Sequence, residues 1–237
     1  MDTNAILNIA AHSPIRTYNW HDRGQAPIGY IKGMAMAFAT VYAKLGAGDA
    51  MAQEMAQAQQ ADAHHDALTW YAPKFQALGM TNGAAGADTL RHLFVLMVGL
   101  GMRESSGRYC EGYDHTVQHP TADNAEAGLF QMSWDAHSTC QFVAPLTRHY
   151  TGRTDLADIF AEHTHCSAAD VANNVGDGPG RDFQQLTKAC PLFAVECAAV
   201  SLRHIRTHWG PINRHDAELK TECDDLFRAV QVVVDQG

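Results

Sequence analysis

Apolar residues recur along this chain at the three- and four-residue intervals that are typical of helices. Between residues 108 and 134 this spacing stops, and glycine, proline, Asp, Asn and aromatic residues are mixed. That stretch predicts an irregular lobe with a short β-hairpin around residues 128–133. The predicted helices cover residues 31–45, 49–62, 64–78, 88–104, 191–208 and 216–234.

The predicted helix over residues 88–104 is apolar on nearly all of its sides. A surface helix has one apolar stripe, so a helix without a polar face belongs at the centre of a domain. It ends in Arg103 and Glu104, and Gly107 is suited to the left-handed residue that closes a helix. The connector at residues 81–87 predicts a boundary between an N-terminal helical extension, 1–81, and a second domain, 82–237.

The composition is that of a globular protein, with 46% hydrophobic and 18% charged residues in a chain of 237. The net charge of −9 argues against a nucleic-acid partner and against simple electrostatic capture of an anionic polymer. No apolar stretch is long enough to span a bilayer and no secretory signal is visible, so we expect no membrane partner and leave the localisation open. The six cysteines are scattered, which leaves both free thiols and disulfides open.

Glu104 is the first residue with candidate chemistry. A carboxylate at the C-terminal end of a buried helix faces the negative end of the helix dipole and lies against apolar side chains, and both effects raise its pKa. A glycosidase needs such an acid, because it must hold a proton near neutral pH to protonate a leaving oxygen. The alternative is a solvated helix end at which Glu104 pairs with Arg103 or Arg108.

A second motif lies in the segment DNAEAGLFQMSW, residues 123–134. The ordered pair of Glu104-Ser105-Ser106-Gly107 and Gly128-Leu129-Phe130-Gln131 resembles the lysozyme superfamily, in particular goose-type lysozymes and soluble lytic transglycosylases. The resemblance implies a mainly α fold, with a lysozyme-like α+β core, a small irregular or β-hairpin lobe and the N-terminal helical extension. It implies that Glu104 is the general acid, and that Gln131 and the backbone from Gly128 to Phe130 line a saccharide cleft.

The resemblance leaves the second carboxylate open. Asp123 stands where goose-type enzymes have one Asp, but Ser133 occupies the position of the other, beside Asp135. Inverting hydrolysis needs a base on the far side of the sugar, which Asp123 or Asp114 could supply. The transglycosylase families need only the one Glu, so both reaction types stay open.

Several further residues are candidates for binding sugar. The segment THWGPINR, residues 207–214, is similar to a segment that follows a helix in transglycosylases, so Trp209 could stack on a sugar ring and Asn213 could bind it. The alternative is that Trp209 is a core residue and Asn213 a helix cap. Tyr109 and Tyr113 flank the acid, as sugar-stacking or as packing residues.

Other motifs do not point to a cofactor. The adjacent residues His64 and His65 diverge on a helix, and the group His163, His165 and Cys166 lacks a spaced partner pair, so we expect no metal. The chemistry of the implied reaction needs no cofactor.

The sequence therefore predicts a glycosidase that cleaves the β-1,4 bonds of peptidoglycan. A lytic transglycosylase, a chitin- or chitosan-degrading enzyme on the same scaffold, and an inactive glycan- or protein-binding module are the alternatives. The expected partner is the glycan substrate, and an inhibitor or immunity protein is a further candidate.

Overall fold

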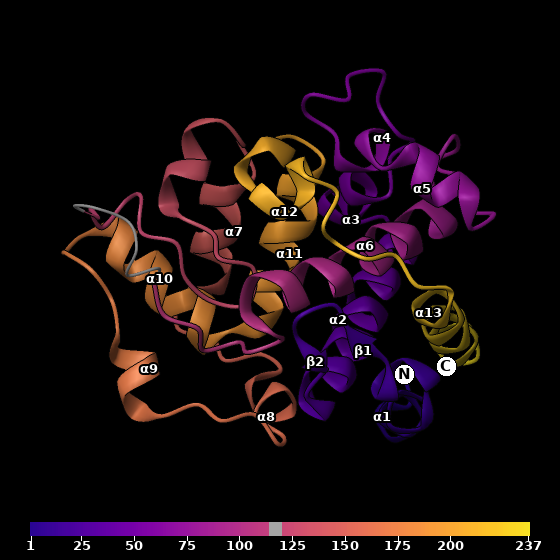
Figure 1. Cartoon of the computed structure of the whole chain (residues 1–237), viewed down its shortest axis with the longest axis horizontal. Coiled ribbons are helices and arrows are strands. Elements are labelled where there is room, and N and C mark those ends of the chain that lie inside the picture. Colours follow the sequence, from indigo (N-terminus) through magenta and orange to yellow (C-terminus); the bar gives the residue numbers. More distant parts are fainter. Residues whose placement is uncertain (114–119) are drawn as a thin grey trace.

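The structure, a computed structural model, describes residues 1–113 and 120–237 and is mainly helical, as the sequence predicts (Figure 1). Its two-stranded antiparallel sheet pairs β1 (Asn19–Trp20) with β2 (Gly24–Gln25). The α-helices are α1 (Thr3–His12), α2 (Ile28–Gly46), α3 (Ala50–Met55), α4 (Ala67–Trp70), α5 (Ala72–Ala77), α6 (Ala87–Ser105), α7 (Val143–Tyr150), α8 (Ala157–Phe160), α9 (Ala168–Ala172), α10 (Pro179–Ala189), α11 (Pro191–Leu202), α12 (Gly210–Asn213) and α13 (Thr221–Asp235). The 3-10 helices are η1 (Pro14–Thr17), η2 (Trp134–Ser138) and η3 (Arg206–His208).

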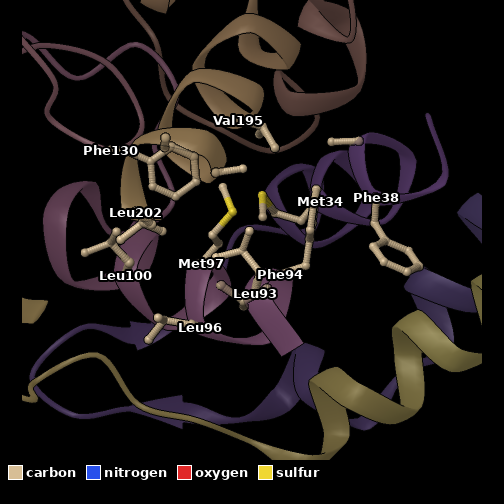
Figure 2. Close-up of a cluster of buried hydrophobic side chains, with 14 of the residues drawn as sticks. Met34, Phe38, Leu93, Phe94, Leu96, Met97, Leu100, Phe130, Val195 and Leu202 are labelled. Carbon is tan, nitrogen blue, oxygen red and sulfur yellow. The ribbon is translucent and has the colours of Figure 1, made fainter. Parts of the chain in front are cut away.

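Helix α6 runs through the middle of the molecule and contacts α2, α11, α12 and α13 (Figure 1). Its side chains are buried from Thr89 to Met102 without a break, which confirms the prediction of a central helix. Figure 2 shows them packed against Met34 and Phe38 of α2 and Val195 of α11. Because α6 is surrounded, its position is set by packing on every side.

The last turn of α6 closes abruptly. Ser106 and Gly107 both adopt left-handed backbone angles, with φ of 54° and 76°. Their N–H groups donate to the carbonyl oxygens of Met102 and Gly101, at 3.1 Å each, which satisfies acceptors at the helix end. A Cβ atom at Gly107 would lie 2.9 Å from the ring of Tyr30, so a glycine is required here. The helix therefore ends directly after Glu104 and Ser105.

The N-terminal part shares its hydrophobic core with the rest of the chain. Helix α2 contacts α6, α11 and α13, and one cluster of buried residues extends from Ile6 to Val230. The predicted division between residues 81 and 82 therefore does not coincide with a break in the core. The hairpin β1–β2, which the sequence did not predict, lies at the end of α6, where Arg23 donates to the carbonyl oxygen of Arg103 at 2.6 Å.

The predicted helix over residues 49–62 ends early, at Met55. Arg203, which is fully buried after α11, donates to the carbonyl oxygens of Met55, Gln57 and Ala58 and to the buried carboxylate of Asp66. Carbonyl groups that would continue the helix are thus bound by the guanidinium. Tertiary contacts override a high helix propensity here.

None of the helices in residues 1–113 and 120–237 combines the length and the apolar character that a membrane crossing demands.

Replacing Gly99 of α6 by alanine should destabilise the fold. A Cβ atom there would lie 2.2 Å from the carbonyl oxygen of Glu218, a backbone atom that cannot turn aside. We expect Gly99→Ala to lower the free energy of unfolding by about 1–3 kcal/mol, measured by urea denaturation. Gly46→Ala, at an exposed helical position with nothing within 4 Å, is the matched control, and we expect it to change stability by less than about 1 kcal/mol.

Candidate functional site

Three segments that are far apart in the sequence meet at the C-terminal end of α6. The hydroxyl group of Ser105 donates to the carbonyl oxygen of Leu129 at 2.8 Å. The indole N–H of Trp209 donates to the carbonyl oxygen of Phe130, also at 2.8 Å. The ESSG, GLFQ and THWGPINR motifs are therefore joined by direct hydrogen bonds, with Glu104 beside them.

The GLFQ residues form a tight turn. Ala127 and Met132 pair in a single antiparallel bridge, with hydrogen bonds of 3.0 and 3.2 Å, so the hairpin predicted around residues 128–133 is reduced to this bridge and its turn. Gly128 has a φ of 77°, and a Cβ atom there would lie 2.9 Å from Cβ of Thr187 on α10. Only glycine combines this backbone angle with so close a neighbour.

Glu104 is half-buried, and its carboxylate makes no hydrogen bond or ion pair with the described residues. Arg103 donates instead to the carbonyl oxygen of His21, and Arg108 pairs with Glu111 and Asp170. The alternative in which Glu104 forms an ion pair with Arg103 or Arg108 is therefore wrong.

The pKa of Glu104 is raised to about 8. Burial contributes most, and the negative charge of Glu126 adds to it, while Arg23, Arg214 and Arg103 act in the opposite direction. The rise that the sequence predicts from apolar surroundings is thus present, with a second carboxylate as a further cause. An acid with this pKa keeps its proton at neutral pH.

Glu126 is the functional candidate that the sequence analysis missed. Its side chain is 39% exposed, and its Oε1 atom lies 3.8 Å from Nε2 of His208, which is itself 15% exposed. Burial lowers the pKa of His208, so the ring is neutral at pH 7. The sequence around it, Ala125-Glu126-Ala127, gives no signal of this kind, because the burial of both alanines and the contact with His208 appear only in the structure.

The structure does not bring Asp123 into contact with Glu104. Asp123 is exposed, and its carboxylate lies against Gly180 at the start of α10, where an added Cβ atom would be 2.4 Å from Oδ1. Ser133 is buried, but together with Asp135 and His208 it lines a cavity of about 330 Å³ between η2 and η3. Asp135 therefore faces this cavity, whereas Asp123 does not line it.

The predicted cleft-lining residues of the turn serve its structure instead. Phe130 is 1% exposed and packs in the core beside Leu100 and Leu202 (Figure 2). The side-chain amide of Gln131 donates to the carbonyl oxygens of Gly112 and Gly128, at 3.2 and 3.0 Å. The backbone carbonyl groups from Gly128 to Gln131 all accept hydrogen bonds from the protein. The prediction that this backbone and Phe130 line the cleft is thus not supported.

Trp209 and Asn213 are also committed to the fold. The Trp209 ring is 1% exposed and has no free face on which a sugar could stack, which corrects the prediction. Asn213 accepts from Arg206 at 2.6 Å and donates to the carbonyl oxygen of Thr207 at 2.9 Å. The alternative interpretation of the sequence is therefore the better one for both residues. Trp209 is an aromatic residue of the core, and Asn213 stabilises the end of α12.

Of the two tyrosines, Tyr109 is half-buried and packs edge-on against Phe160, with ring centroids 6.4 Å apart. Tyr113 is half-buried at the end of the described segment. Asp114, the other candidate base, lies outside the described residues.

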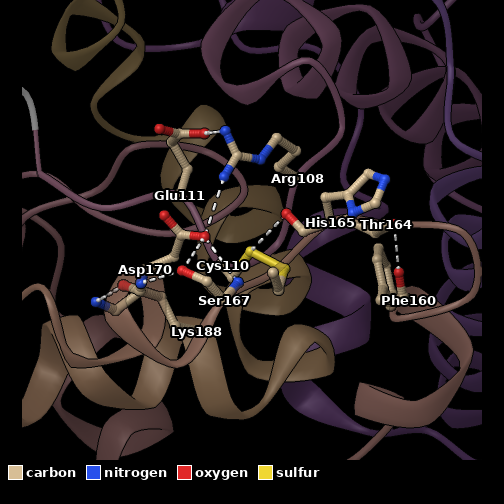
Figure 3. Close-up of a disulfide and its surroundings, with 10 residues drawn as sticks. Arg108, Cys110, Glu111, Phe160, Thr164, His165, Ser167, Asp170 and Lys188 are labelled. Carbon is tan, nitrogen blue, oxygen red and sulfur yellow. Dashed lines mark hydrogen bonds and ion pairs between the residues drawn. A yellow bond between two sulfur atoms is a disulfide. The ribbon is translucent and has the colours of Figure 1, made fainter.

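One disulfide joins Cys110, six residues after Glu104, to Cys166 (Figure 3). Beside it, Arg108 forms ion pairs with Glu111 and Asp170. The carbonyl oxygen of Glu111 accepts from the Gly128 N–H at 2.8 Å. The disulfide thus restrains the backbone at Cys110 and Glu111, and Glu111 is the residue that accepts the hydrogen bond from the GLFQ turn. The four remaining cysteines are buried free thiols.

Two observations concern the histidine and cysteine residues that were considered as metal ligands. Cys166 is bonded to Cys110 and is therefore not available as a thiolate ligand. In the part of the chain that the structure describes, no group of three or more His, Cys, Asp or Glu residues is arranged to hold a metal ion.

A second cavity, of about 610 Å³, lies between α7 and α10, and Trp134, Arg148 and Gln185 are in its wall. None of the described acids at the end of α6 lines it.

Comparisons of this chain with protein-family models, with curated proteins and with solved structures found no match.

Removing the disulfide should loosen the GLFQ turn. The bond closes a loop with a sequence separation of 56, so we expect Cys110→Ser with Cys166→Ser to lower the free energy of unfolding by about 2–4 kcal/mol. Hydrogen exchange of the Gly128 amide, which donates to Glu111, should become faster. A reductant should lower the stability of the wild type and leave the double variant unchanged. If reduction leaves the wild type's melting temperature unchanged, the disulfide has no such role.

Proposed function

We propose that this protein is a glycosidase with a lysozyme-like catalytic core, which cleaves the β-1,4 bonds of peptidoglycan with Glu104 as general acid. The observation that carries the proposal is the half-buried, unpaired carboxyl group of Glu104, whose pKa of about 8 keeps it protonated at neutral pH. It supports transfer of a proton to the glycosidic oxygen as that bond breaks.

The meeting of the motif segments supports the same proposal. ESSG and GLFQ are the residues on which the resemblance to goose-type lysozymes and lytic transglycosylases depends, and a hydrogen bond joins them directly. Two motifs that pair in sequence and also in space are better explained by one shared site than by chance. The roles of the turn residues differ from the expectation, because they support the acid rather than contact the sugar.

The charges around Glu104 favour peptidoglycan over a neutral glycan such as chitin. Arg23, Arg103 and Arg214 lie near enough to lower the pKa of Glu104 against the effects of burial and Glu126. Cationic groups at the site attract carboxylates, which peptidoglycan carries and chitin lacks. The site thus offers arginine side chains to an anionic substrate although the net charge of the protein is −9.

The first test is the substitution Glu104→Gln, which keeps the shape of the side chain and removes the proton donor. We expect the rate of release of sugar ends from purified peptidoglycan to fall at least about 100-fold, with the unfolding midpoint at neutral pH no lower than that of the wild type. Glu222→Gln, at the start of α13, is the control and should leave the rate unchanged.

Unchanged cleavage by Glu104→Gln would show that another group is the acid. If the wild type cleaves neither peptidoglycan nor chitin oligomers, the glycosidase proposal is wrong.

The pH dependence gives a second test. The acid is active while protonated, so cleavage should fall as the pH rises above about 8, where Glu104 ionises. Besides burial, the charges that act on its pKa are those of Glu126, which raises it, and of Arg23, Arg214 and Arg103, which lower it.

Stability should follow the same titration. Because the folded-state pKa lies above the usual 4.5, the folded protein binds the proton more tightly, and the stabilisation present at acid pH is lost as the pH rises through about 8. Glu104→Gln lacks this titration, so its stability relative to the wild type should increase from about pH 5 to about pH 9, measured by urea denaturation. A constant difference across this range would contradict the assignment.

A further inference from the structure

Glu126 stands at the entrance to the GLFQ turn. It directly precedes Ala127, the first residue of the bridge to Met132, and its two alanine neighbours are buried. The side chain of Glu126 is 39% exposed, so water reaches it.

The backbone that carries Glu126 is fastened to the backbone that carries Glu104. Ser105, the next residue after Glu104, donates to the carbonyl oxygen of Leu129 at 2.8 Å. The bridge between Ala127 and Met132 connects this anchor to the residue beside Glu126. Hydrogen bonds thus connect the backbone segments that carry the two carboxyl groups, and the negative charge of Glu126 raises the pKa of Glu104.

The imidazole ring of His208 lies beside the side chain of Glu126. Its Nε2 atom lies 3.3 Å from the carbonyl oxygen of Gln131 and 3.8 Å from Oε1 of Glu126. Since one neighbour is a carbonyl oxygen, which only accepts, Nε2 is assigned the proton. The next residue, Trp209, is fixed by its own bond to Phe130, so the imidazole has little freedom to move.

We propose that Glu126 is the second carboxylate of the reaction, acting as general base on the attacking water, and that His208 is its positioning residue. This inference rests on the proposed glycosidase function. As the bond from the anomeric carbon to the leaving oxygen breaks, that oxygen takes the proton of Glu104. The water oxygen bonds to the anomeric carbon, and one water proton passes to Glu126. Solvent then returns a proton to Glu104 and removes one from Glu126.

This assignment makes the reaction a hydrolysis. A base that takes a proton from water leaves a reducing end on the product, whereas an internal attack by the sugar's own hydroxyl group would leave an anhydro end. Attack by water on the face opposite the leaving group also inverts the anomeric configuration.

The test compares Glu126→Gln with Asp123→Asn, which changes the exposed acid three residues earlier and serves as the matched control. We expect Glu126→Gln to lower kcat on peptidoglycan at least about 100-fold with KM within about threefold, and Asp123→Asn to leave both nearly unchanged. Mass spectrometry and NMR of the wild-type products should show reducing ends of inverted configuration. Anhydro ends or a retained configuration would overturn the role of Glu126 as base.

A substrate with an activated leaving group separates the two acids. A dinitrophenyl glycoside of a chitin oligomer needs no proton donor, so Glu104→Gln should cleave it nearly as fast as the wild type, while Glu126→Gln should not. Azide attacks without a base, and it should restore turnover to Glu126→Ala with a glycosyl azide as product. If azide restores nothing, the base assignment is wrong.

His208 is tested by rescue with a conservative variant. His208→Gln keeps an N–H donor and should retain most of kcat on peptidoglycan, whereas His208→Leu should lose at least about tenfold. Equal loss in both variants would indicate a role in packing alone and would remove His208 from the inference.

These experiments separate the role of Glu126 as general base from the proposed glycosidase function. If the wild type cleaves peptidoglycan, Glu104→Gln does not, and Glu126→Gln does, then the glycosidase stands and the role of Glu126 is wrong. If the wild type releases no ends from any of these substrates, both are wrong.

Discussion

The burial of α6 on all of its sides is the constraint on which the rest of the structure depends. A helix packed against α2, α11, α12 and α13 cannot shift or rotate without opening the core, so the position of its last turn is set by the whole fold. Glu104 lies where the core ends and the helix closes through Ser106 and Gly107. The same burial that places the carboxyl group also raises its pKa, so position and protonation have one cause.

Around this helix end, the site is assembled from segments that have little regular structure. The GLFQ turn is held by hydrogen bonds from Ser105 and Trp209 and by the side chain of its own Gln131. The disulfide of Cys110 (Figure 3) is next to Glu111, whose carbonyl oxygen accepts from the Gly128 N–H. Irregular backbone holds its shape when its polar groups are satisfied by the protein. Because the carbonyl oxygens of the GLFQ turn already accept hydrogen bonds from the protein, they stabilise the turn and are not available to bind a sugar.

The electrostatics of the site combine two opposing influences. Burial and Glu126 disfavour ionisation of Glu104, whereas the arginines favour it, among them Arg23 from the N-terminal hairpin. The resulting pKa of about 8 is high enough to hold a proton and low enough to release it. The N-terminal residues, which carry no recognisable motif, thus contribute both core and charge to the site.

Periodicity alone was enough to predict α2 and α6 nearly to their ends, and the ordered ESSG and GLFQ motifs pointed to Glu104. Such features are local, because apolar spacing and the closing glycine act within a few turns of the chain. The early end of α3 and the burial of Trp209 depended on partners more than a hundred residues away in one case and about eighty in the other. The position of Glu126 near His208, and the effect of its charge on Glu104, belong to this second kind. Spacing along a chain fixes which face a residue occupies, but only the tertiary structure decides which charge stands opposite it.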